Sequence, residues 1–297
     1  MSPGLPGDFY LRDSYIWQMK YFNSNGKILA ENEKVISINS RGVRYGDGLF
    51  ETMKSRNGTL LLANDHFERL WFGMELLQFK TPTHFSAQKF QNEILYLLGK
   101  NGHHDLARIR LTVIRGDGGL FDEISNTPEY VIQTWPLDMS AEEWNSNGLV
   151  LGIYPDARKS CDKFSNVKHN NFLLYVMAAL YAKKQKWNDA VVLNTEGNIC
   201  DTAIANIFMV KDSIIYTPSL DEGCIAGVLR KNILSQLSAN SIPVREAKIT
   251  ADDLLNADEV FLSNSIQNIR WVQSINGKDY SNAFTRKIYS PLLATIF

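Results

Sequence analysis

The chain has 297 residues, 44% of them hydrophobic and 21% charged, with a formal net charge of −1. This length exceeds what one hydrophobic core usually covers, so we expect two domains in a chain of ordinary globular composition. The balanced charge argues against nucleic acid or an anionic membrane as the main partner, and no apolar run is long enough to span a bilayer.

The three cysteines, Cys161, Cys200 and Cys224, are an odd number without a Cys-x-x-Cys spacing. This pattern argues against a disulfide framework and against a zinc site, so we expect no metal. The N-terminus lacks the basic region and apolar run of a signal peptide. Together these features predict a reduced, cytoplasmic compartment.

The first third of the chain is predicted to hold two helices after a loop-rich start with short strand-like pieces such as residues 34–37. Residues 64–80 carry apolar side chains at helical spacing. Asp65 followed by Glu68 is a capping-box pattern, which places the start of this helix there. A second helix is expected over residues 86–98, with Asn-Gly as its stop signal.

A period-two pattern follows over residues 107–114, where Arg108, Arg110 and Thr112 alternate with apolar residues. This alternation predicts a strand with one buried face, and residues 130–135 are a further strand. The polar, irregular segment 137–148 is then the expected linker. We therefore predict domains over residues 1–140 and 141–297.

The second half is predicted to continue with strands and two helices. One helix spans about residues 170–185, and another begins near Gly227. Polar turn residues follow the second of the predicted strands. These strands are expected at residues 149–154, 190–193, 205–210, 214–216, 259–262 and 271–275.

Two segments of this half could hold an anion. Residues 217–230 run from a strand end through a loop into a helix, and Gly223 and Gly227 let backbone amides turn toward a ligand. A helix N-terminus offers unpaired N–H groups and a favourable field for a phosphate. The small polar residues of 261–268 could hold another phosphate oxygen. Taken singly, each segment is equally an ordinary connection, and Arg69, Lys168 and Asp201 are each an ordinary surface or turn residue.

Taken together, these segments resemble the fold-type IV pyridoxal-phosphate enzymes. This family includes branched-chain aminotransferases, D-amino-acid aminotransferases and 4-amino-4-deoxychorismate lyases. The resemblance extends over about residues 37–275. Its most specific pieces are Arg-Tyr-Gly-Asp-Gly-Leu-Phe-Glu-Thr at 44–52, Lys-His-Asn-Asn-Phe-Leu at 168–173, and Glu-Gly-Asn-Ile-Cys-Asp-Thr-Ala-Ile-Ala-Asn-Ile-Phe at 196–208.

The resemblance implies a two-domain α+β fold with a smaller N-terminal α/β domain and a larger C-terminal domain built on a mixed sheet. It also implies pyridoxal 5'-phosphate as the cofactor. The active site is expected at the domain junction of a homodimer, where the neighbouring subunit partly completes it. This organisation agrees with the two domains expected from chain length.

The resemblance also assigns roles to individual residues. Lys168 would form a Schiff base with the cofactor and then move the proton between the substrate Cα and the cofactor's C4′ carbon. Asp201 would face the pyridine nitrogen and keep it protonated. The remaining expected contacts are Arg69, the amides of Val228 and Leu229, Asn264 and Ser265 for the phosphate, and Tyr45 and Arg110 for the substrate, with Arg110 as a carboxylate partner.

The chain departs from the family pattern at several positions. Asp201 stands where the family usually has Glu, and Leu229 replaces the threonine of Gly-Ile-Thr-Arg, as it tends to do in the lyases. Phe172 replaces a tyrosine that reaches the cofactor's phenolate oxygen in many members, and Asn171 is a candidate substitute. The Arg-x-His carboxylate trap of D-amino-acid aminotransferases is not visible after residues 115–119.

Our leading hypothesis from the sequence is transamination between an α-amino acid, of branched-chain type, and a 2-oxo acid. The alternative is a 4-amino-4-deoxychorismate lyase that releases pyruvate with the same lysine and cofactor. A third hypothesis, which Asp201 and Phe172 motivate, is a non-catalytic relative that binds the cofactor weakly. The preferred substrate depends on how loops of both domains close around its side chain.

Overall fold

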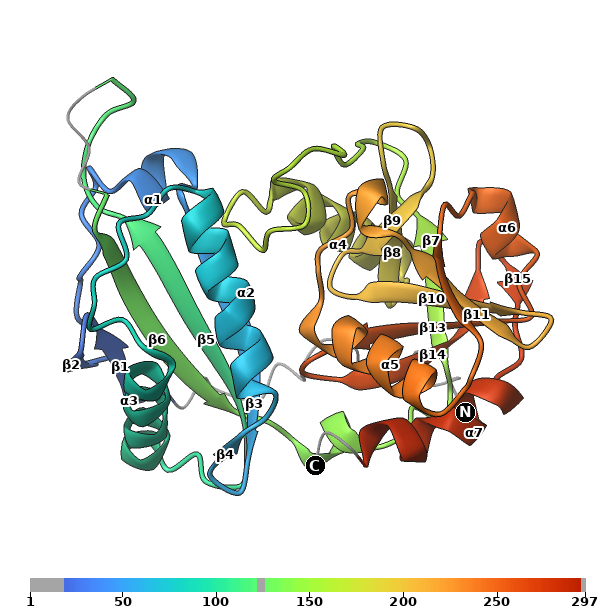
Figure 1. Ribbon diagram of the computed structural model, residues 1–297, viewed down its shortest axis with the longest axis horizontal. Helices are drawn as coiled ribbons and strands as arrows, with labels where there is room; N and C mark the ends of the chain where they lie inside the picture. The colour runs from blue at the N-terminus through green and yellow to red at the C-terminus, as the bar shows by residue number, and fades with distance from the viewer. Residues whose placement is uncertain (1–18, 122–125, 295–297) are drawn as a thin grey trace.

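Two β-sheets, built from successive parts of the chain, form the two lobes of the molecule (Figure 1). The structure, a computed structural model, describes residues 19–121 and 126–294. The segment between the two sheets contains the 3-10 helix η1 (Met139–Glu142). The domain boundary predicted near residue 140 falls in this segment.

The N-terminal lobe contains an antiparallel sheet in the order β2-β1-β6-β5-β3-β4. Helices α2 and α3 pack on one face of this sheet and share a core with it. The strands of this lobe are β1 (Tyr21–Ser24), β2 (Lys27–Ala30), β3 (Gly48–Arg56), β4 (Thr59–Leu60), β5 (Leu106–Arg115) and β6 (Pro128–Pro136). Its helices are α1 (Arg41–Tyr45), α2 (Ala63–Leu76) and α3 (Ala87–Asn101).

Strand β5 confirms the predicted alternation. Ile109, Leu111 and Val113 are fully buried under the two helices. Arg108 and Arg110 therefore lie on the opposite face of the sheet, because successive side chains of a strand point to opposite sides. This second face lines the cavity between the two lobes.

The predicted helices are confirmed, whereas the predicted capping box is wrong. Helix α2 begins after Leu62, which has a left-handed backbone, and no side chain caps its first turn. Asp65 and Glu68 instead bind Nζ of Lys231, at 2.6 and 3.0 Å. The two carboxylates that the local pattern assigned to capping therefore form an ion pair with a helix of the other lobe. Residues 34–37 form no strand.

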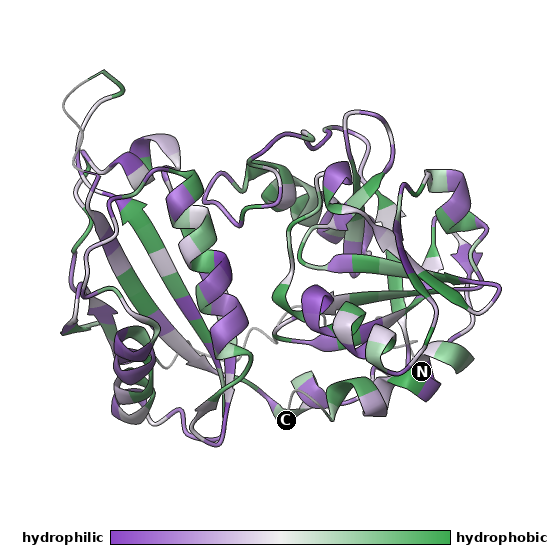
Figure 2. Ribbon diagram, in the orientation of Figure 1, coloured by the Kyte–Doolittle hydropathy of each residue, from purple (hydrophilic) through white to green (hydrophobic). Residues whose placement is uncertain are grey.

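The C-terminal lobe is built on a mixed sheet in the order β12-β11-β10-β13-β14-β7-β8-β9, with β15 paired to β14. Its strands are β7 (Leu149–Ile153), β8 (Asp189–Leu193), β9 (Ile199–Thr202), β10 (Asn206–Lys211), β11 (Ile214–Pro218), β12 (Val244–Ala247), β13 (Glu259–Asn264), β14 (Asn268–Ile275) and β15 (Lys278–Asp279). Its helices are α4 (Leu173–Gln185), η2 (Leu220–Glu222), α5 (Val228–Ala239), α6 (Ala251–Leu255) and α7 (Ala283–Leu293). Many residues of the central strands are hydrophobic, and the cores lie on both sides of the sheet (Figure 2).

Strand β9 was not expected from the sequence. It is short and buried along its whole length, so it shows no period-two alternation. It pairs antiparallel with β8 after the polar turn that the sequence did indicate. This strand carries Asp201 into the interior of the lobe.

Buried contacts join the two lobes. Lys54 Nζ donates a hydrogen bond to Asn268 Oδ1 at 2.7 Å, and burial lowers the pKa of this lysine to about 8. Arg69 Nη1 donates to the carbonyl of Ala226 at 2.9 Å. Val167 packs into the core of the N-terminal lobe although it follows the linker. Within the described ranges, no helix combines the length and apolar character needed to cross a membrane.

Candidate active site

A cavity of about 1350 Å³ lies at the junction of the lobes and is lined by residues of both. The N-terminal lobe contributes the second face of its sheet, including Phe50 and Arg110. The C-terminal lobe contributes Lys168, Asp201 and the start of α5. Three segments that the sequence suggested as one site therefore do meet in a single space.

Lys168 is held at this junction by backbone hydrogen bonds to β3. Its carbonyl accepts from the amide of Phe50 at 3.0 Å, and the amide of Asn170 donates to the carbonyl of Gly48 at 2.9 Å. The side-chain Nζ lies 4.5 Å from the ring centre of Phe50 and 5.1 Å from that of Phe172. The lysine thus enters the cavity between aromatic walls.

These surroundings make the Lys168 amine easy to deprotonate. Burial, assisted by the positive charge of Arg69, lowers the pKa of Lys168 to about 7, whereas Glu51 acts in the opposite direction. An amine with this pKa is substantially neutral at neutral pH, and the neutral amine is the form that attacks a carbonyl. The side chain is therefore suited to Schiff-base chemistry.

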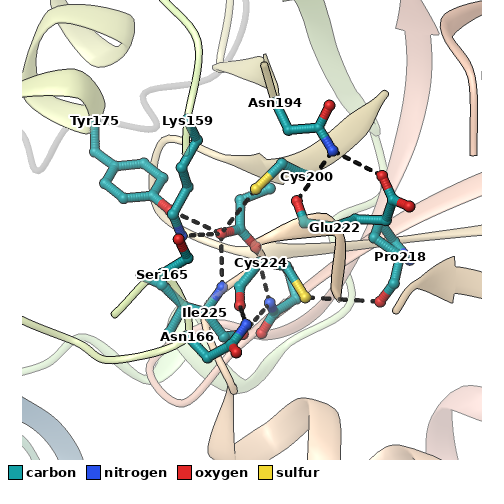
Figure 3. Close-up of polar contacts among 12 residues, drawn as sticks. Lys159, Ser165, Asn166, Tyr175, Asn194, Cys200, Pro218, Glu222, Cys224 and Ile225 are labelled. Carbon is teal, nitrogen blue, oxygen red and sulfur yellow. Dashed lines mark hydrogen bonds and ion pairs between the residues drawn. The ribbon is translucent and has the colours of Figure 1, made fainter. Parts of the chain in front are cut away.

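Asp201 lies on β9 with only 2% of its surface exposed and accepts hydrogen bonds from several donors. Tyr175 Oη lies 2.8 Å away, the amide of Ile225 2.9 Å, Asn206 Nδ2 2.9 Å and Lys159 Nζ 3.4 Å. Figure 3 shows Tyr175, Lys159 and Ile225 converging on this carboxylate. Burial raises the pKa of Asp201, and the charge of Lys159 and the Ile225 amide oppose that rise.

Lys159 and Tyr175 are among the residues of this network that we did not identify from the sequence. Asp201 had no basic partner near it in the chain, and Lys159 reaches it across 42 positions. Tyr175 brings a hydroxyl into the cavity from the first turn of α4. Its hydroxyl donates to Asp201 and not to the place of the hydroxyl that Phe172 lacks. Asn171, the candidate substitute for that hydroxyl, is not among the residues that line the cavity.

The start of α5 provides a site for an anion. Gly227 is its N-cap, and no side chain caps the amides that follow. A Cβ on Gly227 would clash with the side-chain Oδ1 of Asn206, so a larger residue here would displace the amide that binds Asp201. Because the first amides of a helix lack intrahelical partners, those of Val228 and Leu229 can bind an anion here. Arg69 reaches the carbonyl of the neighbouring Ala226, which places a guanidinium beside these amides.

Arg69 is oriented by a buried carboxylate that was also missed. Its Nε and Nη2 bind the two oxygens of Glu51 at 2.8 and 2.5 Å, and His66 Nδ1 lies 2.7 Å from the same carboxylate. Burial favours protonation, yet Arg69 and His66 outweigh it and lower the pKa of Glu51 to about 2. Glu51 is therefore ionised and fixes the plane of the guanidinium. The position of Glu51 in the motif at residues 44–52 is the sequence signal that could have identified it.

Not every predicted site residue faces the cavity in the same way. Asn264 and Ser265 line it, but Asn264 Oδ1 already accepts from the amides of Ile266 and Gln267. Tyr45 is not among the lining residues. Tyr45 lies at the end of α1, and the guanidinium carbon of Arg44 is 5.1 Å from the centre of its ring. Tyr45 therefore does not reach the cavity within one chain, and its contact with the substrate stays a prediction.

The comparisons with known proteins agree with this geometry. The family model described as amino-transferase class IV matches residues 48–275. The chain belongs to the class IV aminotransferase family. Enzymes of this family depend on pyridoxal phosphate, so the predictions of an enzyme and of the fold-type IV architecture are confirmed.

The class IV relatives carry different activities. The aminodeoxychorismate lyase of Vibrio harveyi is 28% identical over 82% of this chain and 89% of its own length. The D-alanine aminotransferase of Bacillus licheniformis is 26% identical over 86% and 88%. The solved structure of the branched-chain aminotransferase of Thermoproteus uzoniensis with norvaline has a TM-score of 0.83 and 22% identity over 93% and 94% of the two chains. Overall similarity therefore does not select one activity for this class IV chain.

Proposed function

We propose that this chain catalyses pyridoxal-phosphate-dependent transamination of an α-amino acid, with a 2-oxo acid as the amino acceptor. The observation that carries the proposal is Lys168, an amine whose pKa is lowered to about 7 and which enters a cavity shared by both lobes. Asp201 and the start of α5 line the same cavity. These three features support the proposal because they line one cavity.

The residues of the cavity fit this cofactor. Uncapped amides at Val228 and Leu229, with Arg69 beside them, suit a phosphate. Ser263 Oγ lines the cavity and, within the described residues, is buried without a hydrogen-bond partner, as expected for a group that binds a polar ligand. Asp201 provides the carboxylate for the ring nitrogen, although it is already bound by donors of the chain itself.

The chemistry divides between the cofactor and the chain. When bound, the cofactor supplies a ring that accepts the electrons left when a proton leaves the substrate Cα. Lys168 would hold the cofactor at its carbonyl group, and its neutral amine would carry the proton away from the substrate Cα. Lys159, Tyr175 and Asn206 hold Asp201 in place, and the aromatic rings of Phe50 and Phe172 limit the access of water to Lys168.

A lyase acting on 4-amino-4-deoxychorismate is the second candidate, and Leu229 favours it. The side chain of Leu229 is buried in the apolar core beside Ile233 and Phe208, so only its backbone amide serves the cavity. The hydroxyl that transaminases commonly place here is therefore missing. The lyase would use Lys168 in the same way but would release pyruvate.

A single-substrate reaction separates the two candidates. Given an amino acid without any 2-oxo acid, a transaminase should release about one equivalent of 2-oxo acid per site and then stop until an acceptor is added. The lyase should instead release pyruvate from 4-amino-4-deoxychorismate continuously. A folded protein that does neither, and takes up no cofactor at saturation, would support a non-catalytic relative.

We also propose a homodimer, in keeping with the family, and a cytoplasmic location, in keeping with three free cysteines. Helix α4 carries an exposed apolar stripe formed by Leu173, Val176, Met177 and Leu180, of which Leu173 is 73% exposed. Val176 also lines the cavity, so a second copy packed on this stripe would border the site. Exposed stripes of this kind commonly mark protein interfaces.

The dimer predicts that Leu180→Arg gives a monomer, because a charge on the stripe would be buried without a partner. Sedimentation velocity measures the change. Gln185→Arg adds the same charge to an exposed position of the same helix and should leave the dimer intact. A wild-type protein that sediments as a monomer at micromolar concentration would contradict the proposal.

A further inference from the structure

Asp189 is a buried carboxylate that the proposed chemistry does not use. It is the first residue of β8, is 2% exposed, and has one oxygen, Oδ2, without a hydrogen-bond partner among the described residues. Its other oxygen, Oδ1, accepts from the amide of Ala203 at 3.0 Å and from that of Ala190 at 2.7 Å. The contact with Ala203 connects β8 to the turn that follows β9. Because an ionised group is costly to bury, a carboxylate in this place calls for an explanation.

The turn at residues 202–205 forms one wall of the cavity. All four of its residues line that space, and Ile204 is 49% exposed. The amide of Thr202 donates to the carbonyl of Ala205 at 2.9 Å, and the hydroxyl of Thr202 donates to the same carbonyl at 3.1 Å. These two bonds connect the ends of the turn, whereas the bond from Ala203 connects its middle to Asp189.

The same turn joins two residues of the carboxylate network. Asp201 precedes it on β9, and Asn206 follows it on β10 and donates to Asp201 Oδ1 at 2.9 Å. A shift of the turn would therefore move Asp201 relative to a donor that binds it. Asp189 itself is not among the described residues that line this cavity. It can therefore act on the site only through the residues of the turn.

Within the described ranges, no cation neutralises Asp189 in an ion pair. The other charged residue that lines the small void beside it is Arg270 of β14, which donates instead to the carbonyls of Ser140 and Ala141. Burial raises the pKa of Asp189 to about 6, and the amides that it binds act in the opposite direction. The carboxyl is therefore largely ionised at neutral pH and takes up a proton in slightly acidic solution. An ionised oxygen holds an amide more strongly than a neutral oxygen does.

We infer that Asp189 is a positioning residue that holds the cavity wall at residues 202–205 in place through the amide of Ala203. This inference rests on the proposed function, because the ligand that meets this wall is the phosphorylated pyridine cofactor. The charge of Asp189 opposes folding, because the folded chain must bury it, but favours binding, because it fixes the turn before the ligand arrives. These opposite effects distinguish a positioning role from a merely structural one.

The test measures the affinity and the stability of Asp189→Asn, which keeps the shape and one acceptor oxygen but removes the charge. The probe is pyridoxine 5′-phosphate, which has no carbonyl group and so cannot react with Lys168. At pH 7.5, calorimetry should show about 5-fold weaker binding to the variant, the difference expected between a charged and a neutral acceptor. Urea unfolding of the unliganded proteins should show the opposite order, with the higher midpoint in the variant.

Both effects of Asp189→Asn should depend on pH. The binding defect should vanish near pH 5, because the carboxyl of the folded wild-type protein is then mostly protonated. The gain in stability should be complete above pH 6 and narrow as the pH falls toward 3.8, the ordinary pKa of the group. Thr202→Val loosens the same turn without removing a titratable group, so its binding defect should not vary over this range. Asp279→Asn, at an exposed position of β15, should change neither quantity.

Equal affinities of the wild-type protein and Asp189→Asn at pH 7.5 would overturn the inference. So would a variant that is less stable than the wild-type protein or does not fold. A binding defect that persists unchanged at pH 5 would overturn it too, because the charge would then not be its cause. A wild-type protein that does not bind pyridoxine 5′-phosphate would contradict the proposed function and the role of Asp189 together, whereas binding without a defect in the variant contradicts only the inference.

Discussion

Lys168→Ala is expected to abolish the near-visible absorption that develops when the wild-type protein is mixed with pyridoxal phosphate. Turnover should fall by about 10⁴-fold or more, because the variant loses both the nucleophile and the group that carries the proton from Cα. The cavity itself should persist, since Lys168 is anchored to β3 through its backbone. Titration with the cofactor, followed by absorbance, measures the first effect directly.

Lys163→Ala is the matched control for this substitution. Lys163 is exposed and lies on the same segment, so its loss should change neither the absorption band nor the turnover. A band that survives in Lys168→Ala would show that another amine binds the cofactor. Lys159 would then be the first residue to examine, because its amine also lies beside Asp201.

The second large effect concerns stability. Arg69→Met should lower the free energy of unfolding by about 3–5 kcal/mol, because it leaves the charge of Glu51 buried without its main partner. The side chains of Glu51 and Arg69 are 2% and 13% exposed, so solvent offers little compensation. The same variant should bind pyridoxal phosphate more weakly, since the guanidinium beside the start of α5 is lost. Urea unfolding monitored by fluorescence measures the stability change.

Two further variants test whether the unpaired charge of Glu51 causes the loss of stability in Arg69→Met. Glu51→Gln combined with Arg69→Met removes both charges and should recover part of the lost stability but not the cofactor affinity. Lys231→Met breaks an ion pair that is 63% exposed on the lysine side, so its cost should stay below about 1 kcal/mol. If Arg69→Met costs no more than Lys231→Met, the buried pair does not stabilise the junction as we argue.

The correct predictions from the sequence rest on local patterns. The alternation in β5 and the stop of α3 at Gly102 depend on neighbouring residues alone, because period and capping chemistry act over a few positions. The motif around Lys168, which predicts the cofactor lysine, is local in the same way. By contrast, the capping box at Asp65 was a valid local pattern that failed because Lys231, far away in the chain, bound the same carboxylates.

By itself, then, the sequence determined the family and the alternation that turns Arg108 and Arg110 to one face, and it singled out Lys168 as the proposed cofactor lysine. Only the tertiary structure decided which partner each charge has. It brings Lys159 to Asp201 and Glu51 to Arg69, and among the described residues it leaves the buried Nε of Arg108 without a hydrogen-bond partner. The reason is physical. A local pattern specifies the direction of a side chain, whereas the presence or absence of a partner depends on every group that folding brings within a few ångströms.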